Sequence, residues 1–210
     1  MADIYIVGLG ILNVDHMTRE TERIIRRSKE VLYVDTGVAT RTYLESLCPL
    51  VTPMYERCYE EDGHRLTAYH HMAVQVLEAA MDHPPVTFAM HGHPIVGVYA
   101  PFLIRDMAGL LGLEVLVLPG VSAMDSLFAE LMIDPCVSGM QMYEATDLLL
   151  RRRPLQPDVP TLIWQIGCVE TRLHTTRVSK PERFERLRGH LLRFYQPHHE
   201  VVAAFSTPHP

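Results

Sequence analysis

The sequence predicts an α/β fold built on a parallel sheet, and three observations carry that prediction. Short apolar runs bounded by turn residues are typical of buried strands, and the run at 113–118 is an example. Segments with apolar residues every three or four positions, such as 122–132, are typical of helices packed on a core. The two kinds of segment alternate along the chain, which is the pattern of a sheet whose strands run parallel.

Capping and spacing signals set the limits of the expected elements. Thr18 is a good N-cap, with Glu20 in the first turn of the helix that follows it. Pro181 suits the first turn of the last helix. The expected strands are residues 3–8, 30–35, 50–54, 85–90, 113–118, 141–144, 161–166 and 199–205. The expected helices are residues 18–28, 41–47, 64–81, 98–111, 122–132, 145–150 and 181–195.

Length and composition narrow the class of protein. The chain has 210 residues, of which 48% are hydrophobic and 21% charged, as in an ordinary folded protein with a real core. No apolar stretch reaches the roughly 18 residues that span a bilayer, and the N-terminus lacks the features of a signal peptide. We therefore expect a cytoplasmic protein that does not bind membranes.

Charge and metal-binding residues exclude further classes. The net charge of −6 argues against nucleic acid as the main ligand, and the run Arg151–Arg153 is expected to be a solvated helix end. None of the four cysteines forms a C-x-x-C pair, so zinc-ribbon and redox spacings are missing. His91 and His93 have no third ligand marked nearby, and no metal is expected.

A glycine-containing turn follows the first expected strand. Val7-Gly8-Leu9-Gly10 resembles the start of a dinucleotide-binding fingerprint, and Asp35 closes the second strand at the distance of a ribose-binding acid. The third glycine of the fingerprint is replaced by Asn13, and the turn before Thr18 is too long for a helix to start on a pyrophosphate. We therefore favour a tight turn beside another ligand.

Two more loops of this kind follow strands. His91-Gly92-His93-Pro94 and Pro119-Gly120-Val121-Ser122-Ala123 both lie at the carboxyl ends of expected strands, where ligands bind in open α/β sheets. Gly120 lets the backbone approach a ligand closely, and Ser122 with the first N–H groups of the next helix can donate hydrogen bonds to it. Together the three loops predict a ligand crevice.

A tyrosine and arginine pattern precedes and opens the long helix at 64–81. Arg65 and Tyr69 are four residues apart and share a helix face, and Tyr59 lies in the acidic loop just before. An arginine close to a tyrosine stabilises the phenolate, which suits removal of a proton from a weak acid. An ordinary surface arginine beside a core tyrosine gives the same pattern.

The motifs, taken in order, resemble those of a known family. They are Val7-Gly8-Leu9-Gly10, Gly92-His93-Pro94, Pro119-Gly120-Val121-Ser122-Ala123, Ile133-Asp134-Pro135, Tyr143-Glu144-Ala145-Thr146-Asp147 and Trp164-Gln165-Ile166-Gly167. This set resembles the tetrapyrrole (corrin/porphyrin) methylase superfamily and, within it, the borosin peptide backbone α-N-methyltransferases. The similarity runs from about residue 3 to about residue 205.

The resemblance implies an architecture and a cofactor. Residues 1–118 would form a parallel-sheet domain and residues 119–210 a mixed-sheet domain, with S-adenosyl-L-methionine bound in the cleft between them and S-adenosyl-L-homocysteine as its product. It also implies a homodimer, and it assigns catalysis to Tyr59, Arg65 and Tyr69. The cofactor contacts that it implies are Gly8, Gly10, His91, Gly92, His93, Pro94, Val96, Val98, Ser122, Ala123, Tyr143 and Gln165.

Two departures from the family pattern matter. The family usually has tyrosine where this chain has His91, which would lie beside the methyl donor. Family members also continue past position 210, so we expect a C-terminal domain that is incomplete relative to the family. Fused members carry their substrate peptide at the C-terminus, and here we expect the peptide to be a separate molecule.

The implied reaction places demands on the site. An amide nitrogen is a poor nucleophile because its lone pair is delocalised into the carbonyl group. Tyr59 or Tyr69 would remove the amide proton, Arg65 would stabilise the phenolate and the imidate oxygen, and the other tyrosine would hold the peptide. Two alternatives remain: a methylase of a tetrapyrrole precursor, and a catalytically weak cofactor-binding partner subunit.

Overall fold

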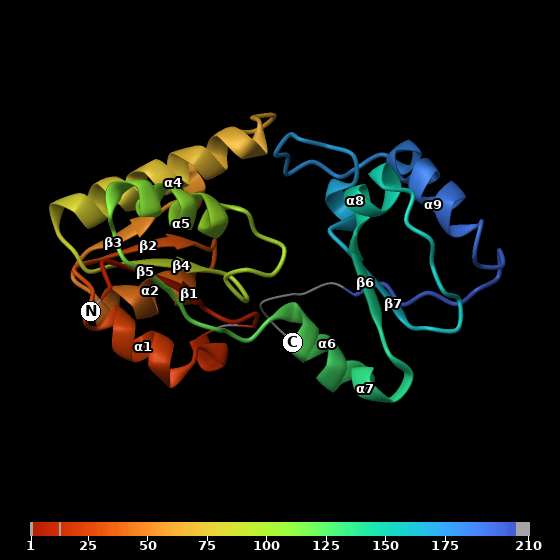
Figure 1. The fold of residues 1–210 in the computed structure, drawn as a ribbon, viewed down its shortest axis with the longest axis horizontal. Coiled ribbons are helices and arrows are strands. Elements are labelled where there is room, and N and C mark those ends of the chain that lie inside the picture. Colours follow the sequence, from red (N-terminus) through yellow and green to blue (C-terminus); the bar gives the residue numbers. More distant parts are fainter. Residues whose placement is uncertain (1, 13, 205–210) are drawn as a thin grey trace.

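The computed structural model describes residues 2–12 and 14–204, and its two sheets lie in separate parts of the molecule (Figure 1). The first part holds a five-stranded sheet, and the second holds a two-stranded sheet. The chain passes from the first part to the second between β5 and α6 (Figure 1). The predicted α/β fold is confirmed, whereas the domain boundary at residue 118 stays a prediction.

The five-stranded sheet is parallel throughout, in the order β3-β2-β4-β1-β5. Its strands are β1 Ile4–Gly8, β2 Glu30–Val34, β3 Val51–Pro53, β4 Val86–Met90 and β5 Val115–Val117. Every residue of β1 and β4 is buried, as expected for central strands covered on both faces. Gly8 pairs with Met90, so the loops that follow β1 and β4 leave the sheet at the same edge.

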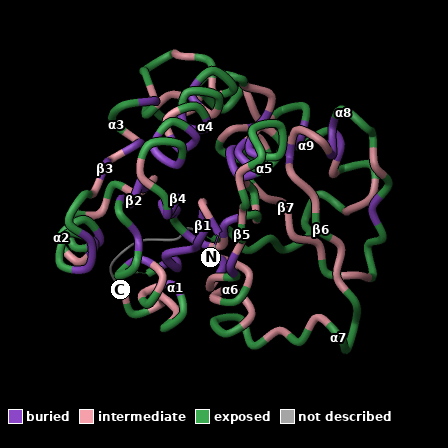
Figure 2. The backbone as a smooth tube through the Cα atoms, turned by 60° about the vertical axis from the view of Figure 1, so that its left-hand side comes forward, coloured by how far each residue is buried: buried purple, intermediate pink, exposed green. Residues whose placement is uncertain are grey.

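Helices cover both faces of this sheet. Figure 1 shows α4 and α5 on one face and α1 and α2 on the other. Their bounds are α1 Arg19–Ile25, α2 Val38–Leu47, α4 Arg65–Asp82 and α5 Ala100–Leu111. Phe88, Met72 and Ile104 belong to the core on the α4 side, while Ile25 and Leu44 belong to the core on the other side. Figure 2 shows this burial concentrated on the sheet and the inward helix faces.

Local signals explain where these helices begin and end. Thr18 caps α1 as predicted, because its hydroxyl accepts a hydrogen bond from the backbone N–H of Thr21 at 3.0 Å. Gly112 ends α5 in the left-handed region, at φ 72°. The structure adds the single-turn helix α3 Tyr55–Cys58, which was not predicted because four residues offer no repeat of apolar positions.

The second part has a small core of its own. Its elements are α6 Ala123–Leu131, α7 Pro135–Ser138, β6 Gln141–Glu144, α8 Ala145–Leu150, β7 Thr161–Trp164, the 3-10 turns η2 Ile166–Cys168 and η3 Pro181–Phe184, and α9 Glu185–Leu191. A further 3-10 turn, η1 Val14–His16, precedes α1. Leu148, Val169 and Leu187 lie in the core of the second part. Among the described residues, no helix is long and apolar enough to cross a membrane.

The prediction was wrong at the end of the chain. Residues 199–204 of the expected last strand form no strand, and residue 205 lies outside the described residues. A strand needs a neighbouring backbone, and neither β6 nor β7 pairs with this segment, so Val201 and Val202 stay 81% and 69% exposed. The mixed sheet expected for this part is therefore, in the described range, a parallel pair. The helix expected at 181–195 splits into η3 and α9.

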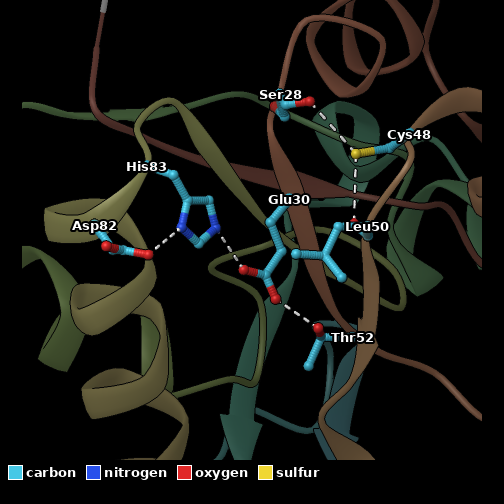
Figure 3. A network of polar contacts seen from close by, with 7 residues as sticks. All are labelled: Ser28, Glu30, Cys48, Leu50, Thr52, Asp82 and His83. Carbon is cyan, nitrogen blue, oxygen red and sulfur yellow. Dashed lines mark hydrogen bonds and ion pairs between the residues drawn. The ribbon is translucent and has the colours of Figure 1, made fainter.

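The buried carboxylate of Glu30 fixes the end of α4 against the first residue of β2 (Figure 3). Glu30, 7% exposed, accepts a hydrogen bond of 2.5 Å from the Thr52 hydroxyl, and the Nε2 atom of His83 lies 2.8 Å from its other oxygen. The Nδ1 atom of His83 lies 3.0 Å from Asp82. Hydrogen bonds to Asp82 and Glu30 raise the pKa of His83 above its ordinary value of 6.5.

We predict that this network makes stability depend on pH. A raised pKa in the folded state means that protonated His83 stabilises the fold fully below pH 6.5, and that this stabilisation is lost as the pH rises through the folded-state pKa. Because the ring is partly exposed, screening limits the effect to about 0.5 kcal/mol. Urea unfolding at acidic and alkaline pH should show a smaller pH dependence for His83→Gln than for the unmodified chain. His70→Gln, on the exposed side of α4, should keep the original dependence, and equal slopes in all three chains would contradict the assignment.

Candidate active site

Three glycines bring the predicted loops into contact at the carboxyl edge of the sheet. A Cβ atom on Gly8 would lie 2.2 Å from the carbonyl oxygen of Gly92 and 3.2 Å from the Cα atom of Gly120. A Cβ atom on Gly120 would lie 2.9 Å from the Cα atom of Gly8. The N–H of Gly92 also donates to the carbonyl oxygen of Gly10 at 2.8 Å. The loops after β1, β4 and β5 thus meet through close backbone contacts, with the side chains of Ile11 and Pro94 beside them.

The loop after β4 is held at both ends. The Nδ1 atom of His91 lies 3.4 Å from Asp35, and Pro94 is buried with its ring against the space beside Gly8. Burial raises the pKa of Asp35, but hydrogen bonds from His91 and the N–H of Gly37 outweigh it and leave the pKa below its usual value. His91, which replaces the family's tyrosine, therefore faces a carboxylate.

The remaining residues of this loop face different ways. The Nδ1 atom of His93 accepts a hydrogen bond from the N–H of Ile95, and the N–H of Val96 donates to the carbonyl oxygen of His93. Val98 packs against the core on the α4 side. The loop is thus a compact turn that lies between the sheet edge and the first residues of α5.

Ser122 holds the start of α6. Its N–H and its hydroxyl both donate to the carboxylate of Asp125, at 2.6 and 2.7 Å, and its hydroxyl accepts from the N–H of Met124. The hydrogen bond from the Ser122 hydroxyl is the largest cause that lowers the pKa of Asp125, and the bond from the Ser122 N–H is the next largest. Ser122 is 3% exposed and its hydroxyl is committed to this cap, which leaves it no free donor for a ligand.

Gln165 links the second part to the loop after β4. Its side-chain Nε2 donates to the carbonyl oxygen of Gly97 at 2.7 Å, and Gly97 adopts φ 70°. Gln165 follows β7 directly and has a φ angle of 57°. Its side chain reaches from the second part to Gly97 of the first part. Tyr143, by contrast, packs against the core of the second part, with the guanidinium of Arg153 5.8 Å from its ring centre.

The predicted tyrosine and arginine residues come together in an aromatic cluster. The rings of Tyr59 and Tyr69 meet edge to face at 6.2 Å, and Tyr69 lies 6.2 Å from the ring of Tyr99. Tyr99 directly follows the loop at residues 91–98, so the cluster adjoins the predicted cofactor loop. Tyr55 of α3 lies 5.0 Å from Tyr59 on the other side.

A loop from the second part, residues 171–177, closes over this cluster. The guanidinium of Arg65 donates to the carbonyl oxygen of Thr171, and the N–H of Arg65 donates to the carbonyl oxygen of Arg172. Figure 1 shows this loop beside the first turn of α4. Arg65 is thus oriented by a segment far away in the sequence, a contact that sequence spacing could not reveal.

Acidic residues tie the same loop down. Glu61 accepts hydrogen bonds from the hydroxyl groups of Thr175 and Thr176 and from the N–H of Thr176. The Thr175 hydroxyl, followed by the two donors of Thr176, lowers the pKa of Glu61 to about 2. Arg177 pairs with Asp62 at 2.9 Å. The acidic loop that precedes α4 therefore serves as the docking point of residues 171–177.

The two predicted tyrosines have different surroundings. Burial is the largest cause that raises the pKa of Tyr59. The neighbouring phenol of Tyr69, and then that of Tyr55, raise it further, whereas Arg65 lowers it only in part. A cavity of about 60 Å³ adjoins Tyr59 and is also lined by Glu60, His64, His71 and His174. Sequence reasoning missed Tyr99 and His174, since neither belongs to a motif.

The other interpretations of the sequence find structural explanations. A Cβ atom on Gly10 would lie 2.2 Å from that of His16, because η1 packs there instead of the start of a helix. Asn13 lies outside the described residues. Asp35 accepts a hydrogen bond from the N–H of Gly37 rather than facing an open ribose site. In the arginine run, Arg151 and Arg153 both pair with Asp147.

These features define an α/β protein whose candidate site lies at the carboxyl edge of its parallel sheet. The profile of the Tetrapyrrole (Corrin/Porphyrin) Methylases matches residues 3–206. The chain belongs to this family.

Curated relatives come from fungi. A methyltransferase/ribosomally synthesized type I borosin cyclic peptide precursor from Serendipita vermifera subsp. bescii is 34% identical over 197 residues, which are 94% of this chain and 48% of that protein. A methyltransferase/ribosomally synthesized cyclic peptide dendrothelin A precursor from Dendrothele bispora is 31% identical over 208 residues, 98% of this chain and 50% of that protein. The chain spans about half the length of these relatives.

Solved structures share the fold. Uroporphyrin-III C-methyl transferase from Thermus thermophilus, complexed with S-adenyl homocysteine, has a TM-score of 0.59 at 20% identity, with 90% of this chain and 75% of that chain covered. The methyltransferase CobJ has a TM-score of 0.57 at 16% identity, with 89% and 75% covered. At these identities the likeness concerns the fold.

We predict that Gly120→Ala will strain the meeting point of the three loops. The added methyl group would press on the backbone of Gly8, and overpacking of this kind costs about 1–3 kcal/mol of unfolding free energy. Gly109→Ala, in α5 with no atom within 4 Å of the new Cβ, is the matched control and should be neutral or stabilising. Chemical unfolding measures both, and equal stabilities of Gly120→Ala and the unmodified chain would show that the loops can separate freely.

Proposed function

We propose that the chain transfers a methyl group from S-adenosyl-L-methionine to backbone amide nitrogens of a peptide. The observation that carries this proposal is the aromatic cluster: Tyr59, Arg65 and Tyr69 lie together and adjoin the loop at residues 91–98 through Tyr99. The family membership and the names of the fungal relatives, which join methyltransferase and peptide precursor, support it.

The crevice fits a ligand that needs close backbone approach. Gly8, Gly92 and Gly120 let the backbones of the three loops approach one another closely, and Gly92 and Gly97 hold positive φ angles of 74° and 70°. Exposed backbone N–H and C=O groups at such turns can hydrogen-bond the adenosine and amino-acid ends of S-adenosyl-L-methionine. When bound, this cofactor supplies an electrophilic methyl group on a sulfonium sulfur. The residues proposed to hold it are those that the resemblance implied, except Ser122, whose N–H and hydroxyl both bond to Asp125, and Tyr143, which packs on the core of the second part.

The surroundings of the tyrosines favour one assignment of roles. Burial opposes ionisation of Tyr59, so this residue suits a hydrogen-bond donor rather than a base. Tyr69, whose ring meets that of Tyr59 edge to face, then takes the amide proton, and the neutral Tyr59 phenol stabilises the Tyr69 phenolate. Arg65, oriented by Thr171, stabilises the negative charge that develops on the amide oxygen.

The proposal includes the state of the substrate and of the protein. The peptide is a separate molecule, S-adenosyl-L-homocysteine is the product, and two copies of the chain form the working unit in the cytoplasm. Apolar side chains exposed on the second part support a homodimer, and they include Met132, Val137 and Met142. Size-exclusion chromatography with light scattering tests the dimer.

The first prediction of the proposed function concerns catalysis. Tyr69→Phe and Arg65→Ala should each lower the methylation rate by about two orders of magnitude, because one removes the proton acceptor and the other the charge that stabilises the imidate. The assay incubates the chain, S-adenosyl-L-methionine and synthetic peptides of varied sequence, and follows mass steps of one CH₂ group. Tyr43→Phe, on α2, is the control. Unchanged rates in both site variants, or methylation of a tetrapyrrole but no peptide, would refute the proposal.

Our second prediction concerns the cofactor. Gln165→Ala removes the hydrogen bond to Gly97 and should weaken S-adenosyl-L-methionine binding by about fivefold, the equivalent of about 1 kcal/mol. Isothermal titration calorimetry measures the Kd, with Gln196→Ala at an exposed site as the control. If Gln165→Ala binds the cofactor as tightly as the unmodified chain does, the link across the two parts plays no role in binding.

A further inference from the structure

His174 is the residue through which the second part touches the tyrosine cluster. It belongs to the loop at residues 171–177, and its ring stacks on Tyr59 with ring centres 4.6 Å apart and planes 34° apart. Its Nε2 atom lies 3.2 Å from the hydroxyl oxygen of Tyr55. Its backbone N–H donates to the carbonyl oxygen of Gly63, and its carbonyl oxygen accepts from the N–H of Asp62. The imidazole is therefore fixed from both the side chain and the backbone.

His174 also shares a cavity with Tyr59. The cavity measures about 60 Å³, and it lies between the end of α3, the loop before α4 and the first turns of α4. A space of this size holds about two water molecules. The titratable groups that face His174 or line the cavity with it are Tyr55, Cys58, Tyr59, Glu60, His64 and His71.

Each methyl transfer in the proposed reaction releases the proton of the amide nitrogen, and the site has to pass that proton on. The amide N–H bond breaks and its electron pair stays on the nitrogen, which forms the new N–C bond; the S–C bond breaks and its pair stays on the sulfur. The proton passes to the Tyr69 phenolate, which must lose it again before the next methyl transfer. The rings of Tyr59 and Tyr69 meet edge to face at 6.2 Å, but the raised pKa of Tyr59 means that its phenol cannot hold the negative charge for long.

We propose that His174 relays this proton: Tyr59 receives it from Tyr69 and, in the same step, gives its own proton through cavity water to His174. Imidazole takes up and releases protons near neutral pH and has two nitrogen atoms, so it can accept on one side and release to solvent on the other. His174 acts through Tyr59 and does not touch the reacting atoms, so it is a positioning and relay residue. This inference rests on the proposed function.

The carboxylate of Glu61, which holds the loop at residues 171–177, does not titrate over the pH range of this inference. The pKa of Glu61, lowered to about 2 by Thr175 and Thr176, keeps that carboxylate ionised and the loop docked far below neutral pH. Loss of activity in mildly acidic solution therefore does not come from release of Glu61. The relay predicts such a loss for another reason, since protonated His174 can no longer accept a proton.

The experiment compares two substitutions that keep different properties of the side chain. His174→Phe keeps a ring that can stack on Tyr59 but cannot titrate, and His174→Gln keeps a polar group within reach of Tyr55. The rate of peptide methylation is measured from about pH 5 to about pH 8, roughly the range over which imidazole changes charge, with the peptides that the unmodified chain methylates. Both variants should lose about tenfold in kcat at alkaline pH, with KM unchanged, and should lose the acidic fall of the rate seen in the unmodified chain.

Rescue and control variants separate a relay from a structural role. Free imidazole should restore part of the kcat of His174→Ala and leave His70→Gln, which lies outside the cavity, unaffected. A uniform loss at every pH without rescue, or an unchanged profile in His174→Phe, would overturn the relay while leaving the proposed function intact. A His174→Phe chain that fails to fold leaves His174→Gln and the rescue to decide. If the unmodified chain binds S-adenosyl-L-methionine by calorimetry yet methylates no peptide, the proposed function and the relay both fall.

Discussion

The contact between the backbones of Gly8, Gly92 and Gly120 is the constraint on which the site depends. Any side chain at Gly8 would collide with a carbonyl oxygen of the neighbouring loop, so the loops can come this close only with glycine at that position. Parallel pairing of β1 with β4 and β5 brings the ends of these strands to one edge, and glycine lets their loops touch there. The contact between the loops is thus a consequence of strand register combined with glycine at the points where the backbones meet.

The second part completes the site rather than merely standing beside it. Thr171 orients Arg65, Gln165 reaches Gly97, and His174 stacks on Tyr59. Glu61 and Asp62 hold the same segment through several donors, and the strongly lowered pKa of Glu61 reflects how well those donors are arranged. The positions of Arg65, Gly97 and Tyr59 therefore depend on the docking of the second part.

Different environments separate two phenols that the sequence leaves equivalent. Burial and neighbouring phenol groups oppose ionisation of Tyr59, whereas Tyr69 sits on the first turns of α4 and adjoins the loop at residues 91–98 through Tyr99. A Tyr59 phenol that stays neutral is suited to donating a hydrogen bond to a group that carries negative charge. The unusual His91, paired with Asp35, lies at the other end of the same loop.

The sequence by itself determined the parallel α/β sheet, nearly all strands and helices of the first part, and the three glycine loops, because strand and helix periodicity and the steric freedom of glycine are local properties. It also singled out Tyr59, Arg65 and Tyr69. It failed at α3, which is too short to show a repeat, and at residues 199–204, where apolar character alone cannot supply a pairing partner. Two contacts become visible only in the tertiary structure. The hydroxyl of Ser122 bonds to Asp125 of the helix that it caps, and His174 meets Tyr55 across 119 positions of the chain. Such contacts arise from the docking of one part on the other, and no spacing within a single segment encodes them.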